Sequence, residues 1–249
     1  MKQPILTGKH IVKRFSQTDT AVLQQLNVEL YEGDFTVIMG ASGAGKSTLL
    51  YALSGMSDIN EGEIIFQHHD IAHNREKQMA VLRRNAFGFV FQQTHLVSNL
   101  TLLENVAVAG YLNDDKTSRQ TKKRAEMLLE SMHVAHVMDR LPSQVSGGEA
   151  QRAAIARAII NEPDLLFADE PTGALNRKNS DEVLHLLGKL HENGQSILMV
   201  THDIRAASYG TRILYMDDGK ILDELDLSNQ LHRKEKEVKV NQWLTTLMW

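Results

Sequence analysis

The sequence predicts an α/β fold built on a parallel β-sheet, and three observations carry that prediction. The runs 165–168 and 197–200 are wholly apolar, which is typical of parallel strands that are buried on both faces. Between them, apolar residues recur at helical spacing over 183–190, so a crossover helix is expected there. The apolar run 35–39 leads into a glycine-rich loop and then a helix-like segment, 49–53. Strands that alternate with helices in this way indicate an α/β sheet.

Composition excludes several classes of function. The chain has 249 residues, 42% of them hydrophobic, which is enough to build a buried core. Its 27 basic and 31 acidic residues give a net charge of −4, so nucleic acid is not an expected partner. The absence of cysteine excludes disulfides, cysteine zinc sites and thiol catalysis. No apolar run approaches the roughly 18 residues that a membrane span needs, so a membrane role is expected to come through a partner.

The first 90 residues read as short strands and turns. Strands are expected at 5–12, 22–30 and 35–39, with a turn at 32–34 between the last two. A hairpin is expected from 62–66 to Ile71 through the turn 67–70. This stretch contains three histidines, and a polar turn explains them better than a metal site because no acidic cluster accompanies them: His68, His69 and His73.

From about residue 100 the pattern becomes helical. Ala125, Leu128, Leu129 and Met132 form one apolar stripe, which predicts a helix over 118–132. Another helix is expected to begin near Ser146, because Ser-Gly-Gly-Glu has the spacing of a capping box.

A phosphate-binding loop is the strongest local signal. Residues 40–48, Gly-Ala-Ser-Gly-Ala-Gly-Lys-Ser-Thr, match G-x-x-x-x-G-K-[ST] between a strand and a helix. In such a loop, backbone N–H groups and the helix N-terminus bind phosphate oxygens, the lysine reaches the β- and γ-phosphates, and the serine hydroxyl ligates Mg²⁺. We therefore expect a nucleoside triphosphate and Mg²⁺ as cofactors, with these nucleotide-binding residues: Gly40, Ser42, Gly43, Ala44, Gly45, Lys46, Ser47 and Thr48.

Polar residues follow two of the expected strands at their carboxyl ends, where parallel sheets bind ligands. Asp169 ends one buried run and is expected to hold Mg²⁺, while Glu170 would orient or deprotonate the attacking water. His202 follows the run 197–200 and could contact the γ-phosphate.

A family resemblance now becomes specific. The stretch Val145-Ser-Gly-Gly-Glu-Ala-Gln-Arg152 resembles the signature of ATP-binding-cassette (ABC) proteins. Phe91-Gln92 resembles the Q-loop of that family, Ala174-Leu-Asn176 its D-loop and Thr201-His202-Asp203 its H-loop, in matching order over residues 1 to about 225. The resemblance implies a P-loop NTPase fold: a RecA-like parallel core, an antiparallel β subdomain and an inserted helical subdomain. It places the ATP-binding domain at 1–227, the helical insertion at about 93–162 and a C-terminal extension at 228–249.

The resemblance also implies a catalytic arrangement. Two copies would pair head to tail, each ATP lying between one phosphate loop and the partner's signature residues Ser146, Gly147, Gly148 and Glu149. Catalysis would use Glu170, His202 and Gln92, and Mg²⁺ would be held by Ser47, Gln92 and Asp169. Gln92 is preferred to Gln93 because it directly follows the apolar strand, although a one-residue exchange is possible. Phe15 would stack on adenine, with a core aromatic as the alternative, and Asn176 would lie at the dimer interface.

Two residues depart from the commonest family pattern. Glu149 stands where many cassettes carry Gln, a choice that resembles the lipoprotein-release and macrolide-export branch. Asn176 stands where the D-loop usually has Asp, which removes one interfacial carboxylate and leaves the tuning of site coupling open.

Architecture narrows the expected role. The chain shows no long domain after residue 230, which disfavours an importer of the sugar type. It shows no second cassette, which disfavours a translation-factor ATPase, and no coiled-coil insertion between Lys46 and Ser146, which disfavours a DNA-maintenance ATPase. We therefore expect an ATPase subunit that serves a separate permease and is peripheral on the inner face of the cell membrane. Residues 167–176 and 206–209 resemble antimicrobial-peptide exporters and sensors of the bacitracin-resistance kind, with lipoprotein-release, macrolide-export and cell-division cassettes as alternatives.

The C-terminal tail leaves two readings open. One helical stripe is expected to pack back onto the domain or to contact a membrane or partner, and it consists of Val240, Leu244, Leu247 and Met248, with Trp243 or Trp249 beside it.

Overall fold

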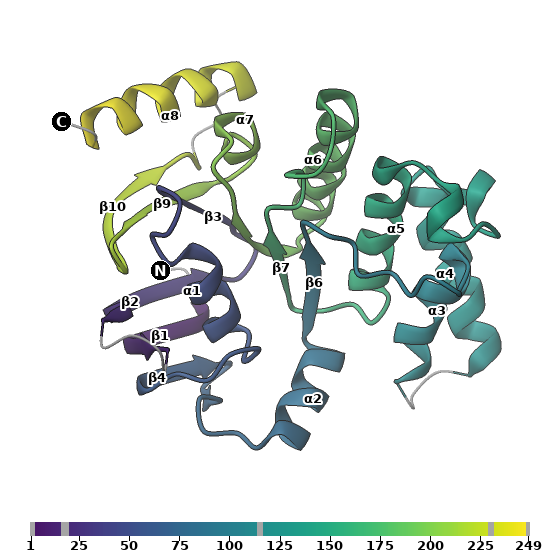
Figure 1. Ribbon diagram of the computed structural model, residues 1–249, viewed down its shortest axis with the longest axis horizontal. Helices are drawn as coiled ribbons and strands as arrows, with labels where there is room; N and C mark the ends of the chain where they lie inside the picture. Colours follow the sequence, from purple (N-terminus) through teal and green to yellow (C-terminus); the bar gives the residue numbers. More distant parts are fainter. Residues whose placement is uncertain (1–2, 16–19, 114–116, 229–231, 248–249) are drawn as a thin grey trace. The chain divides into compact units, whose positions relative to one another are not determined.

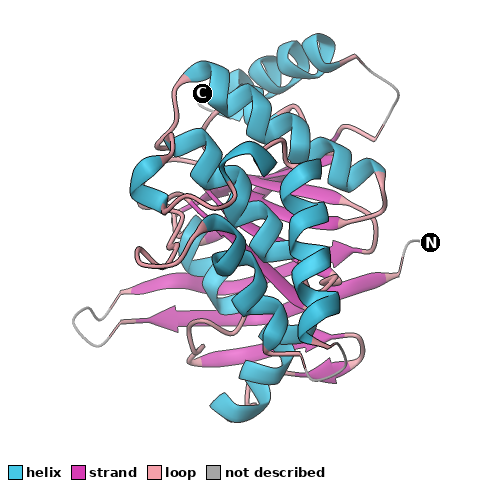
Figure 2. Cartoon of the chain, turned by 90° about the vertical axis from the view of Figure 1, so that its right-hand side faces the viewer, coloured by secondary structure: helices cyan, strands magenta, loops and turns pink. Residues whose placement is uncertain are grey.

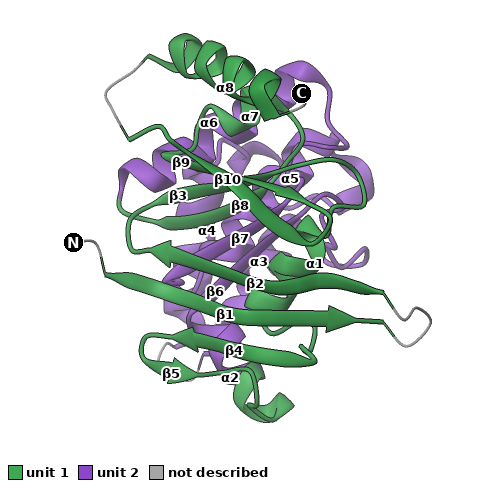
Figure 3. Cartoon of the chain, turned by 90° about the vertical axis from the view of Figure 1, so that its left-hand side faces the viewer, with its two compact units in different colours: residues 1–79, 194–249 green, residues 80–193 purple. Residues whose placement is uncertain are grey.

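The computed structural model describes residues 3–15, 20–113, 117–228 and 232–247. These residues form both helices and strands, coloured cyan and magenta in Figure 2. The chain divides into two compact units, coloured green and purple in Figure 3. Unit 1 consists of residues 1–79 and 194–249, and unit 2 of residues 80–193.

Unit 1 contains an antiparallel sheet near its N-terminus. Its strand order is β2-β1-β4-β5, and these strands lie side by side in Figure 3. Their bounds are β1 Pro4–Arg14, β2 Ala21–Tyr31, β4 Glu61–Phe66 and β5 His69–Asp70. The alternation of buried and exposed residues in β2 confirms a strand with one face toward the core.

The parallel strands of unit 1 carry the phosphate loop. Strand β3 (Phe35–Met39) lies between β8 (Ser196–Val200) and β9 (Arg212–Asp217), parallel to both, and β10 (Lys220–Asp226) completes the order β10-β9-β3-β8. Every residue of β3 and of β8 is buried, which confirms that these apolar runs are strands buried on both faces. Helix α1 (Lys46–Leu53) follows β3, and the short helix α7 (Ile204–Ala207) follows β8.

Unit 2 joins a pair of parallel strands to helices. Strand β6 (Phe87–Phe91) pairs with β7 (Leu165–Asp169), with Phe91 opposite Asp169. The helices are α3 (Leu102–Tyr111), α4 (Ser118–Ser131), α5 (Gly147–Ile159) and α6 (Arg177–Glu192), with 3₁₀ turns at Ala135–Val137 and Pro142–Gln144. Capping boxes begin α3, α4 and α5, so local sequence fixes the first residue of each.

Most predicted elements are present, but α7, β9 and β10 were not predicted, and one helix lies where strands and turns were expected. Helix α2 (Glu76–Asn85) lies in the stretch read as strands and turns, and the boundary between the two units falls within it. Met79 is its only buried residue, so its sequence lacks the apolar stripe that predicts a helix. The bounds expected for the helical insertion, 93–162, stay a prediction, since unit 2 also includes β6, β7 and α6.

The tail forms helix α8 (Arg233–Leu247), which packs beside α7 within unit 1 (Figure 1). Val240 is fully buried, and the indole of Trp243 donates a hydrogen bond to Asp223 Oδ2 at 2.9 Å. The Nζ of Lys236 donates to the carbonyl of Gly210 at 3.0 Å. Of the two readings of the tail, packing onto the domain is therefore confirmed for the described residues, while Met248 and Trp249 lie outside them.

Across the described residues, no helix combines the length and the apolar character that a membrane span requires.

Candidate functional site

The phosphate loop connects β3 to α1 in unit 1. Its lysine is folded back over the loop: Lys46 Nζ donates to the carbonyl oxygens of Gly40 at 2.9 Å and Ala41 at 2.7 Å. Ala44 is buried and the loop residues Ala41, Ser42 and Gly43 are exposed. Lys46, Ser47 and Thr48 form the first turn of α1, so the lysine and serine stand beside the helix N-terminus as the motif predicts.

Two glycines of the loop are required by close contacts. A methyl group on Gly40 would lie 1.9 Å from the carbonyl oxygen of Met216, which no side chain could tolerate. Gly45 is the N-cap of α1 with φ 96°, a left-handed conformation that favours glycine, and a methyl group there would lie 2.9 Å from the carbonyl oxygen of Val22. The tight loop is therefore built by glycine at both ends.

His202 lies at the end of the strand next to the phosphate loop. In the β3 and β8 register, Ile38 pairs with Val200, so Gly40 and His202 each lie two residues beyond a paired residue. A hydrogen bond of 3.2 Å from the N–H of Thr201 to the carbonyl of Ile38 holds Thr201 in place. Asp203 caps α7 by accepting from the N–H of Arg205 at 2.8 Å, so both neighbours of the exposed His202 are anchored.

The predicted catalytic carboxylates end a strand of unit 2. Asp169 is the last residue of β7 and is buried, and Glu170 follows it with φ 46°. Because Phe91 pairs with Asp169, the next residues, Gln92 and Glu170, leave neighbouring parallel strands at the same level. Unit 2 thus brings Gln92, Asp169 and Glu170 to one edge of its strand pair.

Two residues of α5 hold this edge in place, and no sequence motif predicted a role for them. The buried amide of Gln151 donates to the carbonyls of Phe91 and Pro171, both at 2.8 Å, and so ties together the segments after β6 and β7. Arg157 donates to the carbonyls of Thr94 at 2.7 Å and His95 at 2.6 Å. A buried polar residue on an apolar helix face was the available signal for Gln151.

The signature residues form the N-terminus of α5, as predicted. Ser146 is the N-cap: its hydroxyl oxygen accepts from the N–H of Glu149 at 3.3 Å, and its own N–H donates to Glu149 Oε2 at 2.8 Å. Hydrogen bonds from Ser146 lower the pKa of Glu149, with a smaller contribution from His136. Gly147 is exposed and Gly148 is buried in the same first turn.

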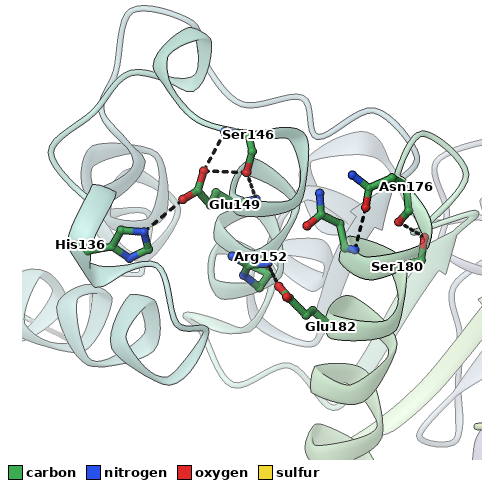
Figure 4. A network of polar contacts seen from close by, with 8 residues as sticks. His136, Ser146, Glu149, Arg152, Asn176, Ser180 and Glu182 are labelled. Carbon is green, nitrogen blue, oxygen red and sulfur yellow. Dashed lines mark hydrogen bonds and ion pairs between the residues drawn. The ribbon is translucent and has the colours of Figure 1, made fainter.

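Asn176 of the predicted D-loop is the N-cap of α6. Its Oδ1 accepts from the N–H of Asn179 at 3.0 Å, and its carbonyl accepts from the hydroxyl of Ser180 at 3.0 Å (Figure 4). An amide caps a helix as well as a carboxylate does, so the departure from Asp keeps the local structure.

Phe15 follows β1 and is 47% exposed, which rules out the alternative of a core aromatic. Its ring lies 5.2 Å from Lys13 Nζ. His68 lies in the exposed turn before β5, and His69 is the exposed first residue of that strand.

The structure therefore groups the predicted residues in two sets. Unit 1 holds Phe15, the phosphate loop and His202; unit 2 holds Gln92, Asp169, Glu170, the signature and Asn176. The donor atoms expected for Mg²⁺ are hydroxyl, amide and carboxylate oxygens, which are the ligands that this hard cation prefers.

Comparison with known proteins agrees with these motifs. Residues 23–173 match the family model described as ABC transporter. The chain is 43% identical over 204 residues to the lipoprotein-releasing system ATP-binding protein LolD of Aquifex aeolicus, covering 82% of this chain and 91% of that protein. It is 38% identical over 233 residues to the macrolide export ATP-binding/permease protein MacB of Pasteurella multocida, covering 93% of this chain but only 36% of MacB, so it spans about a third of that relative's length.

Solved structures show the same likeness. The chain superposes with a TM-score of 0.83 on the ATP-binding cassette MJ0796 in a dimeric post-hydrolysis state bound to ADP and Pi, at 35% identity. The match covers 89% of this chain and 98% of that one. With a family model that covers more than half of its residues and relatives well above 30% identity, the chain belongs to the ABC transporter family.

Proposed function

We propose that this chain is an ATPase that binds MgATP, pairs head to tail with a second copy and drives a membrane permease. One observation carries the proposal: Lys46 is held within a glycine loop beside the N-terminus of α1, and His202 stands at the end of the neighbouring strand β8. This is an arrangement suited to a triphosphate, since the lysine and the N–H groups favour negative charge and the imidazole can reach its outer end.

In this proposal the residues of unit 1 bind the nucleotide. Lys46 would exchange its contacts with the loop carbonyls for the β- and γ-phosphate oxygens, because an ammonium pairs more strongly with an anion than with a neutral carbonyl. Backbone N–H groups between Gly40 and Thr48 would bind the phosphates, and the exposed ring of Phe15 would stack on adenine.

Hydrolysis would use the polar residues that follow the parallel strands and the serine of the phosphate loop. Ser47, Gln92 and Asp169 would hold Mg²⁺, which supplies charge neutralisation when it is bound. Glu170 would take a proton from the attacking water, and His202 would donate a hydrogen bond to the γ-phosphate. The positive φ of Glu170 supports this role, because strained backbone is concentrated at functional positions.

The signature would complete the nucleotide site of a second chain. Ser146 and the N–H groups of Gly147 and Gly148 begin a helix of 13 residues, whose N-terminus favours an anion. The dimeric state reported for MJ0796 with ADP and Pi supports a pairing of this kind.

Complementation between two inactive chains tests this arrangement. Ser146→Arg should leave nucleotide binding intact but block pairing, because a long cation would occupy the place of the partner's γ-phosphate. Lys46→Ala should impair nucleotide binding but keep its signature. Mixed together, they should recover up to one working site per heterodimer, measured as phosphate release.

The control for this experiment is Ser131→Arg, which places the same side chain on an exposed position of α4 and should leave hydrolysis intact. Mixed with Lys46→Ala, it should form both active homodimers and heterodimers with one working site, because its phosphate loop and both signatures are intact. If mixing Ser146→Arg with Lys46→Ala restored nothing while cross-linking proved that the heterodimer forms, the head-to-tail arrangement would be rejected.

We further propose that the permease belongs to the branch that handles lipoproteins, macrolides or antimicrobial peptides, with the chain bound at the inner face of the membrane. The similarity to LolD and MacB supports the branch, and residues 167–176 and 206–209 favour the peptide group. A clean deletion should sensitise cells to peptides that target the cell wall. If it instead mislocalised lipoproteins and left peptide tolerance intact, lipoprotein release would replace peptide resistance, and the ATPase proposal would stand.

A further inference from the structure

Glu149 poses a problem for the signature that the proposed function does not solve. It places a carboxylate in the first turn of α5, and that turn is the one expected to meet the partner's γ-phosphate. Two negative groups close together repel each other. The residues around Glu149 donate hydrogen bonds to its carboxylate, and these contacts stabilise the negative charge.

The carboxylate and the serine hydroxyl already engage each other. Ser146 Oγ donates its hydrogen to Glu149 Oε2 at 2.6 Å, and the same oxygen also accepts from the N–H of Ser146 at 2.8 Å. A hydroxyl has a single hydrogen to donate. Ser146 can therefore donate to a γ-phosphate only after its hydrogen leaves Glu149.

His136 supplies the other contact of the carboxylate. Its Nε2 lies 3.1 Å from Glu149 Oε1, and it comes from the 3₁₀ turn Ala135–Val137, as Figure 4 shows. A carboxylate only accepts, so Nε2 must carry the hydrogen of this bond. The side chain of Glu149 is 18% exposed and that of His136 is 65% exposed, so this contact joins a mostly buried carboxylate to an exposed imidazole.

We propose that His136 is a positioning residue for the signature: it holds Glu149 while Ser146 transfers its hydroxyl hydrogen bond from that carboxylate to the γ-phosphate bound by the partner. During this exchange Glu149 Oε2 loses the hydroxyl of Ser146 and keeps only the N–H of that residue. The hydrogen bond from His136 to Oε1 then supplies a larger share of the stabilisation of the carboxylate. His136 thereby lowers the ATP concentration at which two chains close. This inference rests on the proposed head-to-tail pairing.

The test uses the full chain with Glu170→Gln, which should accumulate as a closed dimer with MgATP. The fraction of dimer is measured by analytical ultracentrifugation over a range of MgATP concentrations. His136→Leu removes the donor and should raise the half-maximal ATP concentration about two- to five-fold, the range of an exposed pair. His136→Gln keeps a donor near the position of Nε2 and should restore the parental value. His185→Leu, on an exposed position of α6, is the matched control.

A second series of variants, made with Glu149→Gln, separates the role of His136 in closing the dimer from a merely structural role. Glu149→Gln keeps the capping geometry but removes the charge, and hydrogen bonds to a neutral amide are weaker than those to a carboxylate. In that background His136→Leu should change the half-maximal ATP concentration by less than about 1.5-fold. Nucleotide affinity of the monomeric chain, measured below the concentration at which it dimerises, should be the same in all variants.

Three outcomes would overturn the role proposed for His136, and the last of them would overturn the pairing as well. An equal effect of His136→Leu in both backgrounds, or an effect on monomer nucleotide affinity, would overturn the inference in favour of a structural role. A parent chain that closes normally while His136→Leu changes nothing would overturn the inference alone. A parent chain that stays monomeric with MgATP would overturn the proposed pairing and this inference with it.

Discussion

Gly148 lies directly against Asn179, so the signature turn of α5 and the first turn of α6 are in close contact. A methyl group on Gly148 would lie 2.4 Å from Cγ and 2.8 Å from Nδ2 of Asn179. The ion pair of Arg152 with Glu182 links the same two helices further along (Figure 4). Since Asn176 caps α6, the D-loop and the signature are attached to one pair of packed helices.

Gly148→Ala should therefore destabilise the chain, by about 1–3 kcal/mol, because the new methyl group forces Asn179 out of its place. The free energy of unfolding is measured by urea denaturation. Gly147→Ala is the matched control, since a methyl group there would be 3.6 Å from Leu175 Cδ2, an ordinary contact. The double variant Gly148→Ala/Asn179→Ala should be more stable than Gly148→Ala, because the shorter side chain makes room for the methyl group. A double variant no more stable than the single one would argue against the contact.

Lys46→Ala should weaken MgATP binding by at least about tenfold, because it removes the only side-chain cation of the phosphate loop. Isothermal titration calorimetry measures the affinity directly. Lys123→Ala, on the exposed face of α4, removes a similar cation and should leave the affinity unchanged. An affinity that survives the loss of Lys46 would reject its role in binding phosphate.

Glu170→Gln should keep MgATP affinity but lower the hydrolysis rate by a factor of about 10² to 10⁴, since an amide cannot accept the proton of water. The steady-state release of phosphate gives the rate, and Glu130→Gln on α4 serves as the surface control. Parental turnover by Glu170→Gln would show that another group acts as the base.

Val240→Ala should lower the free energy of unfolding by about 1–3 kcal/mol, because Val240 is fully buried where α8 packs on unit 1. Val238→Ala makes the same change two residues away at a position that is 57% exposed, and should stay within about 0.5 kcal/mol of the parent. Thermal and urea denaturation would both register the difference. Equal effects of the two substitutions would contradict the packing of α8 through Val240.

Local signals could be predicted from the sequence because their partners are a few residues away. The phosphate loop needs glycines at fixed positions between a strand and a helix, and its motif specifies all of them. The capping box of α5 joins Ser146 to Glu149, residues within one helical turn. Apolar runs predicted β3 and β8 because both strands are buried completely.

Contacts between distant residues were decided by the tertiary structure. The two carbonyls bound by Gln151 come from residues 60 positions earlier and 20 positions later in the chain. Helix α2 has no apolar stripe to predict it. The tail had two open readings, and the contacts of Val240 and Trp243 selected one of them.

The chain by itself thus determined the phosphate loop, the signature and the family, because each is a short pattern whose residues act on the backbone next to them. The tertiary structure alone decided which side chains hold those patterns in place. A hydrogen bond such as those of Gln151, His136 or Trp243 depends on a donor and an acceptor meeting in space, and a linear pattern contains no information on that distance.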